Sequence, residues 1–204
     1  MAATFDDPRI CRIVAEAASS VCQGEIIQTQ RRFDLTLTKK EYFKIIELKT
    51  GALFAVAAQL GARISQASDE IQLQLKEFGL KIGTAYQIYD DCIDLVGDET
   101  STGKTLGTDL EKGKLTLPLL NLISSGTEAQ KEKLNQRILL KEPIDTNALA
   151  GIADYDGAIE RALETGRSLL TESRELLSPL NESSYKTGLI EITNYLEKLF
   201  TDCI

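Results

Sequence analysis

Histidine is absent from the 204 residues, and cysteine is scarce. Zn²⁺ and other soft-ligand metals bind chiefly through histidine and cysteine, so the composition disfavours such a metal site. The four cysteines form no CxxC pair and no dense framework: they are Cys11, Cys22, Cys92 and Cys203. This usage is typical of reduced thiols, and we therefore expect a cytoplasmic protein.

Basic clusters are also missing. The net charge is -8, and no run of basic residues is longer than Arg31–Arg32 or Lys39–Lys40. Binding to a nucleic-acid backbone or to anionic lipid needs a cationic surface, so neither is expected. The first ten residues lack the apolar core of a secretory signal. Apolar runs such as residues 52–58 are too short to span a bilayer, which predicts no transmembrane segment.

Alternating patterns typical of β-strands are missing too, and the apolar residues, 43% of the chain, recur at helical spacing. The length suits one domain covering residues 1–204. We therefore expect an all-α helical bundle with its site between facing helices. The predicted helices cover residues 9–30, 38–64 with a capping box at Thr38, 71–96, 127–140, 147–151, 154–177 and 182–200.

The most distinctive stretch, residues 83–120, joins the end of the helix predicted over 71–96 to a loop with several glycines. Ser68 is expected to cap this helix and Gly97 to end it. No other part of the sequence places three aspartates and two glycine-preceded lysines so close together. This stretch is therefore the first candidate for a functional site.

The aspartates of this stretch indicate a metal. Asp90 and Asp94 lie one turn apart, and Asp91 is about 100° around the helix from Asp90, so we expect all three on one rim. The helix dipole and mutual repulsion both disfavour carboxylates at a helix C-terminus, so a cation is expected there. Mg²⁺ takes oxygen ligands and completes its shell with phosphate oxygens. The three aspartates are therefore the predicted metal ligands.

Two lysines complement the aspartates. Lys104 follows Gly103 and Lys114 follows Gly113, and glycine lets the backbone approach an anion closely. Lysine binds phosphate as a point charge. The combination predicts a phosphorylated ligand.

The segment YQIYDDCIDLVGDETSTGKTLGTDLEKGKLTLPLL resembles the second aspartate-rich region of the trans-isoprenyl (polyprenyl) diphosphate synthases. The pattern of that family is FQxxDD, a hydrophobic pair and D, followed by GK and then by GxDLxxGKxTLP. Tyr86 stands where the pattern has phenylalanine, and Cys92 fills one of the middle positions. The resemblance implies an isoprenoid-synthase-type helical bundle.

Two further segments resemble the same family. Residues 22–28 are similar to its CEGE block and following glutamine, with Gln23 in place of an acid, although a glycine at a close helix crossing explains this segment equally well. Lys49 and Thr50 match a KT pair. The resemblance implies that Lys49 reaches the allylic diphosphate and that Thr50 lies near the reacting carbon.

The resemblance also implies roles for the remaining site residues. Gln87 would lie beside the reacting centre, Lys104 and Lys114 would add positive charge around the diphosphate, and Asp109 would hold metal-bound water or a lysine. The implied activity is that of a Mg²⁺-dependent prenyltransferase that condenses an allylic diphosphate with isopentenyl diphosphate. Two or three Mg²⁺ ions belong to a complete site. The departing diphosphate would remove the final proton.

One departure from the family pattern is large. The family has a first aspartate-rich motif upstream of the CEGE-like block, whereas here Asp6–Asp7 is followed by proline without a third aspartate. The resemblance thus covers the C-terminal portion of a synthase, a domain lacking its N-terminal helices. A truncated or processed synthase and a naturally short subunit that needs a partner both fit this pattern, and we expect little activity from the chain alone.

Other functions compete with prenyl transfer. A non-catalytic or regulatory subunit of a heteromeric synthase would explain the missing half-site, but it gives no reason to cluster aspartates and lysines. A terpene cyclase is disfavoured because its second metal motif is usually of the N-S/T-E type, unlike the motif at residues 90–94. The family also implies a homodimer.

Overall fold

Every regular element in the part of the chain that the computed structural model describes, residues 4–97, 106–140 and 155–203, is a helix. This confirms the predicted all-α class. In chain order the elements are α1 (Pro8–Gln30), α2 (Lys39–Ile46), a π-helical segment η2 (Glu47–Gly51), α3 (Ala52–Ile64), α4 (Asp69–Val96), α6 (Thr108–Glu111), α7 (Leu117–Ser125), α8 (Glu128–Leu140), α10 (Tyr155–Glu175) and α11 (Ser184–Thr201).

The predicted helix ends are confirmed at α2 and α4. The Thr38 hydroxyl accepts a hydrogen bond from the Glu41 backbone N–H at 3.2 Å, and the Glu41 carboxylate accepts one from the Thr38 N–H at 2.9 Å, which forms the expected capping box. The Ser68 hydroxyl accepts from the N–H of Ile71 at 3.3 Å, and Gly97 ends α4. Local sequence therefore sets these boundaries.

The single helix predicted over residues 38–64 is wrong in one respect, because the π-helical segment η2 interrupts it. A π-helical turn shifts the register of the side chains that follow it and is frequent at functional sites. Gly51 ends this segment against α4, where a Cβ atom would lie 2.9 Å from Leu80 Cδ1 and 3.0 Å from Thr84 Oγ1. The segment carries Lys49 and Thr50.

The C-terminal half largely follows the prediction. Helices α8, α10 and α11 match the helices expected over 127–140, 154–177 and 182–200 to within about two residues, the usual scatter of helix ends. The helix expected over 147–151 lies outside the described residues. Helix α7 was not predicted. Its residues 117–122 are all buried, and a helix that is covered all round shows no amphipathic period.

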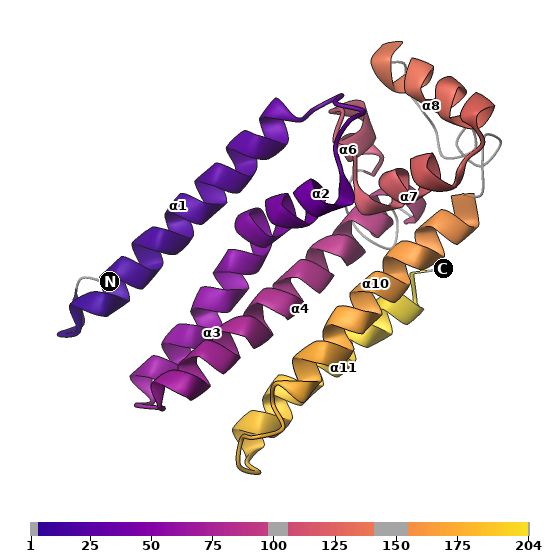
Figure 1. Cartoon of the computed structure of the whole chain (residues 1–204). Coiled ribbons are helices and arrows are strands. Elements are labelled where there is room, and N and C mark those ends of the chain that lie inside the picture. Colours follow the sequence, from indigo (N-terminus) through magenta and orange to yellow (C-terminus); the bar gives the residue numbers. More distant parts are fainter. Residues whose placement is uncertain (1–3, 98–105, 141–154, 204) are drawn as a thin grey trace.

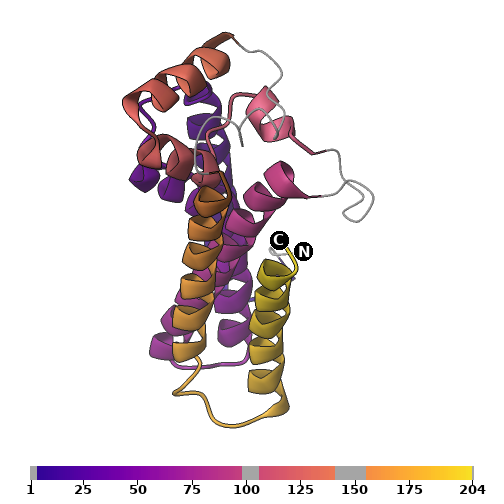
Figure 2. The ribbon, with the colours of Figure 1, turned by 90° about the vertical axis from the view of Figure 1, so that its right-hand side faces the viewer.

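The long helices stand side by side, in the order α1, α3, α4, α10, with α11 returning along α10 (Figure 1). Helices α6, α7 and α8 gather at one end of the bundle, the end at which α4 reaches its C-terminus (Figures 1 and 2). Helix α4 supplies much of the core, including Phe78, Ile82 and Ile88. Helix α4 approaches α3 closely at Gly79, which has no side chain. A Cβ atom there would lie only 2.3 Å from the Phe54 carbonyl oxygen.

An ion pair connects α4 to α10. The Lys81 ammonium lies 2.8 Å from the Glu172 carboxylate and 3.6 Å from Glu77, one turn earlier on α4. This hydrogen bond lowers the pKa of Glu172, and it raises the pKa of Lys81. The pair therefore bridges the two helices in its charged form.

One helical run in the described part of the chain, Lys39–Ile64, is long and apolar enough to cross a membrane by length and composition alone. It has 26 residues and a mean hydropathy of 1.3 in its best window, of which 28% is buried. The short apolar runs of the sequence did not predict this. Core helices of proteins that never enter a membrane meet the same two criteria, so the finding carries no argument for a membrane.

Candidate functional site

The three aspartates of the acidic motif lie on the last turns of α4, but they do not share one rim as the sequence predicted. Asp90 and Asp94 are partly exposed, whereas Asp91 is only 4% exposed. One residue step turns a side chain by about 100°, and here that step turns Asp91 into the bundle. The expected rim is therefore formed by Asp90 and Asp94.

Asp91 is held by hydrogen bonds to both of its oxygens. The Tyr42 hydroxyl of α2 donates to Oδ2 at 2.6 Å, and the Gln87 side-chain amide donates to Oδ1 at 2.9 Å. Burial raises the pKa of Asp91 to about 7, and the two hydrogen bonds act in the opposite direction. Burial also raises the pKa of Tyr42 well above its ordinary value.

Gln87 connects the acidic motif to the π-helical segment. Its amide oxygen accepts a hydrogen bond from the Thr50 hydroxyl at 2.6 Å, although the two residues are 37 positions apart in sequence. Thr50 is partly exposed and Gln87 is 8% exposed. The structure therefore brings together Thr50, Gln87 and the acidic motif, which the sequence assigned to one site.

Lys49, next to Thr50, faces α1. Its ammonium donates to the Gln28 side-chain oxygen at 3.0 Å and lies 3.5 Å from the Glu25 carboxylate. The two helices meet closely at Gly24, where a Cβ atom would lie 2.6 Å from the Lys49 backbone nitrogen. The sequence suggested a glycine at a close helix crossing, and Gly24 is that glycine. Gln28 and Glu25, from the same segment of α1, contact the predicted substrate-binding residue Lys49.

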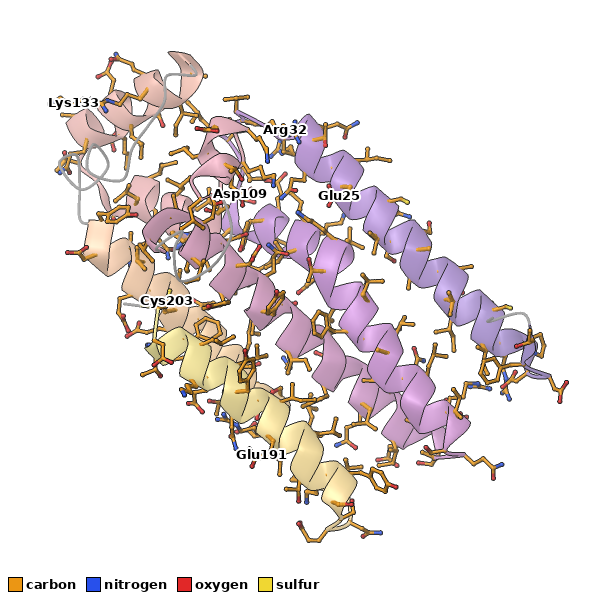
Figure 3. All side chains as sticks on the ribbon, turned by 180° about the vertical axis from the view of Figure 1, so that it is seen from behind. Glu25, Arg32, Asp109, Lys133, Glu191 and Cys203 are labelled. Atoms are coloured by element: carbon orange, nitrogen blue, oxygen red, sulfur yellow. The ribbon has the colours of Figure 1, made fainter. Side chains whose placement is uncertain are left out.

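Asp94 and Asp109 link α4 to the glycine-containing loop and α6. The backbone N–H of Asp109 donates to Asp94 Oδ2 at 3.0 Å, and the Lys114 ammonium donates to Asp109 Oδ1 at 2.5 Å. Lys114 and Asp109 are only 17% and 16% exposed. Burial raises the pKa of Asp94. Figure 3 places Asp109 at the same end of the helical row as Glu25.

Lys104, the remaining predicted lysine, lies outside the described residues. Among the residues that are described, no three acidic or cysteine side chains converge closely enough to hold an ion by themselves. An ion bound by these described residues would need further ligands, and Mg²⁺, which typically uses one or two carboxylates with waters and phosphate oxygens, meets that condition.

Sequence reasoning missed Tyr42, which lies seven residues before Lys49 in an ordinary helical pattern. Its hydroxyl donates a hydrogen bond to Asp91 at 2.6 Å. Nothing in the local sequence signals this role, because the contact spans 49 positions. Only the packing of α2 against α4 creates it.

The helical fold places the chain in the isoprenoid-synthase class of bundles. The chain belongs to the polyprenyl synthetase family, because the sequence model described as "Polyprenyl synthetase" matches residues 1–155.

Two characterised relatives illustrate the similarity. The chain is 29% identical over 184 residues to the geranylgeranyl diphosphate synthase of Methanosarcina mazei, covering 90% of this chain and 56% of that protein. It is 30% identical over 198 residues to heptaprenyl diphosphate synthase component 2 of Bacillus subtilis, covering 97% of this chain and 56% of that protein. The chain thus spans about half the length of these relatives.

Solved structures show the same relation. A decaprenyl diphosphate synthase from Rhodobacter capsulatus superposes with a TM-score of 0.85 at 26% identity, covering 94% of this chain and 60% of that chain. A polyprenyl synthase from Caulobacter crescentus, complexed with calcium and isoprenyl diphosphate, superposes with a TM-score of 0.85 at 28% identity, covering 92% of this chain and 58% of that chain. The family resemblance seen in the sequence is confirmed.

Proposed function

We propose that this chain provides one side of the site of a Mg²⁺-dependent prenyltransferase, as a single domain, and that the reaction extends an allylic diphosphate with isopentenyl diphosphate. The observation that carries the proposal is the hydrogen bond from Thr50 to Gln87. It joins the KT pair to the acidic motif, the two separate blocks on which the family resemblance rests. The names of the similar synthases support the same class of reaction.

Asp90 and Asp94 are the side chains that would hold Mg²⁺. Both are partly exposed carboxylates on one rim of α4, and their oxygens are the ligand type that Mg²⁺ prefers. The calcium and isoprenyl diphosphate bound by the Caulobacter relative are consistent with a divalent ion and a diphosphate in one site. When bound, the ion stabilises negative charge on the departing diphosphate. Two or three ions are proposed for a complete site.

The lysines would share the task of binding the diphosphate. The Lys49 ammonium donates to Gln28 and lies 3.5 Å from the Glu25 carboxylate, so a diphosphate would share this ammonium with Glu25. Lys114 is paired with Asp109, so it can contact a diphosphate only by exchanging or sharing that carboxylate. We retain Lys104 from the family pattern as the third cation.

Thr50 and Gln87 would act on the hydrocarbon part of the substrate. The side-chain oxygens of Thr50 and Gln87 lie 2.6 Å apart and carry partial negative charge. Such oxygens stabilise the positive charge that develops on the allylic carbon when the carbon–oxygen bond breaks. The chain has no histidine to remove the final proton, so the departing diphosphate is the proposed base.

A partner is part of the proposal. The chain spans 56% of each of the two synthases named above, and one of these is named as a component. A separate subunit or further residues of a longer synthase would supply the first aspartate-rich motif, and a homodimer is the assembly that the family resemblance implies. A regulatory subunit stays the second candidate. All four cysteines are free thiols, which supports a reducing compartment such as the cytoplasm.

The direct test is calorimetry of the 204-residue chain with inorganic pyrophosphate, with and without Mg²⁺. We expect saturable binding that requires Mg²⁺, is abolished by EDTA, and is weakened by Lys49→Ala. An equally tight complex without Mg²⁺, or no complex at all, would contradict the proposal.

A further inference from the structure

Asp91 differs from the aspartates on either side of it. Asp90 and Asp94 are partly exposed, whereas Asp91 is 4% exposed and accepts a hydrogen bond at each oxygen. A metal ion could reach it only by displacing Tyr42 or Gln87 from a site already closed to solvent. Its burial and contacts therefore indicate a task other than metal binding.

The hydrogen bonds around Asp91 fix the direction of every donor. An ionised carboxylate only accepts, so Gln87 turns its NH₂ group toward the ionised Asp91. The amide oxygen of Gln87 then necessarily faces Thr50, from which it accepts at 2.6 Å. Without Asp91 the amide could rotate by half a turn and present its NH₂ group, with the opposite partial charge, on the Thr50 side.

Tyr42 holds Asp91 from the other side. The Tyr42 hydroxyl donates to Asp91 Oδ2 at 2.6 Å, across 49 positions of sequence. The tyrosine is 3% exposed, so its hydroxyl has no water to bond instead. A continuous chain of hydrogen bonds thus runs from Tyr42 of α2 through Asp91 and Gln87 of α4 to the π-helical segment.

We propose that Asp91, anchored by Tyr42, is a positioning residue that sets the orientation of the Gln87 amide, and that it is not a metal ligand. The inference rests on the proposed function, because the orientation matters when the Gln87 oxygen faces a developing allylic cation. The inference assigns different roles to the aspartates of one motif. Asp90 and Asp94 would bind the ion, whereas Asp91 would orient the Gln87 amide toward the reacting carbon.

Isosteric amides separate the two tasks. Asparagine at position 91 keeps an oxygen that can accept from Gln87 and an NH₂ group that can donate to the Tyr42 oxygen, but it loses the charge that a metal ligand supplies. We expect Asp91→Asn to change the Mg²⁺-dependent affinity for inorganic pyrophosphate by less than about threefold. Asp90→Asn and Asp94→Asn should each weaken it about tenfold or more, as loss of groups at a metal site does.

The orientation is tested by the side-chain amide signals of Gln87 in ¹⁵N-labelled chain, identified by their loss in Gln87→Met. We expect Tyr42→Phe to shift these signals and to speed their exchange with water. Tyr155→Phe is the matched control, because the Tyr155 hydroxyl also donates to α4, at the Leu95 carbonyl, without touching Gln87. A purely structural role would lower the melting temperature in both variants and leave the Gln87 signals unmoved.

Different outcomes overturn different claims. Loss of pyrophosphate binding in Asp91→Asn as large as in Asp90→Asn would make Asp91 a ligand and overturn the inference. Gln87 signals unchanged in Tyr42→Phe would overturn the positioning chain. If the unaltered chain binds no pyrophosphate with Mg²⁺, the proposed function fails, while the signals of Gln87 still decide whether Asp91 and Tyr42 set the amide.

Discussion

Gly24 of α1 lies so close to Lys49 of the π-helical segment that a Cβ atom would be 2.6 Å from the Lys49 nitrogen and 2.9 Å from its Cα. The close approach brings the Lys49 ammonium to Gln28, 3.0 Å away on the same helix α1. A glycine without any catalytic group therefore decides where the predicted substrate-binding lysine stands.

Gly24→Ala should destabilise the chain. The added methyl group meets backbone, which cannot rotate away, and overpacking of this kind costs about 1–3 kcal/mol. Gly188→Ala is the matched control, since a Cβ atom there meets nothing within 4 Å and alanine favours a helix over glycine by about 0.5–1 kcal/mol. Urea unfolding should show the two variants changing in opposite directions. Equal stability of both would show that α1 does not pack tightly on Lys49.

The 204-residue chain alone should have little or no condensing activity. It carries one aspartate-rich motif, whereas the family resemblance implies two on facing helices. The measurement is incorporation of labelled isopentenyl diphosphate into longer products by the purified chain, with a full-length relative as the positive control. Robust incorporation would show that one motif suffices.

Asp90→Ala in a complete synthase that contains this sequence should lower kcat by about a hundredfold or more. Removing one group that stabilises charge in the transition state typically has this effect. Glu191→Ala, an exposed acid far from the acidic motif, is the control and should leave kcat unchanged (Figure 3). Turnover and Mg²⁺ dependence that match the unaltered enzyme would remove Asp90 from the site.

Glu172→Gln should lower the free energy of unfolding by less than about 1 kcal/mol at pH 7, because the bridge to Lys81 is partly exposed. The pKa of Glu172 is lower in the folded chain than its ordinary value of 4.5. The stabilisation is therefore complete above that value and is lost as the pH falls through the folded pKa. Urea unfolding at pH 7, 5 and 3.5 should show the difference shrinking only at the lowest pH. A difference that is constant with pH would exclude the ion pair as its cause.

Much of the site was predictable because its residues lie in compact sequence motifs. The spacing of apolar residues and the Ser68 cap place α4 correctly, and the pattern after residue 86 names Asp90, Asp94 and Asp109. The pairing of Asp109 with Lys114, one of the two roles expected for it, joins residues only five positions apart. Interactions between residues that are only a few positions apart can be predicted from the sequence.

The sequence by itself determined the helical class, the helix caps and the family, since helical period, capping and motif spacing all act over short distances. Tertiary structure alone decided that Asp91 points inward, that Tyr42 meets it, and that Thr50 meets Gln87. These contacts span 49 and 37 positions, and they depend on how closely helices approach at glycines and on the register set by a π-helical turn. Periodicity predicts which face of a helix is apolar, but it does not predict which polar side chain on a neighbouring helix lies opposite.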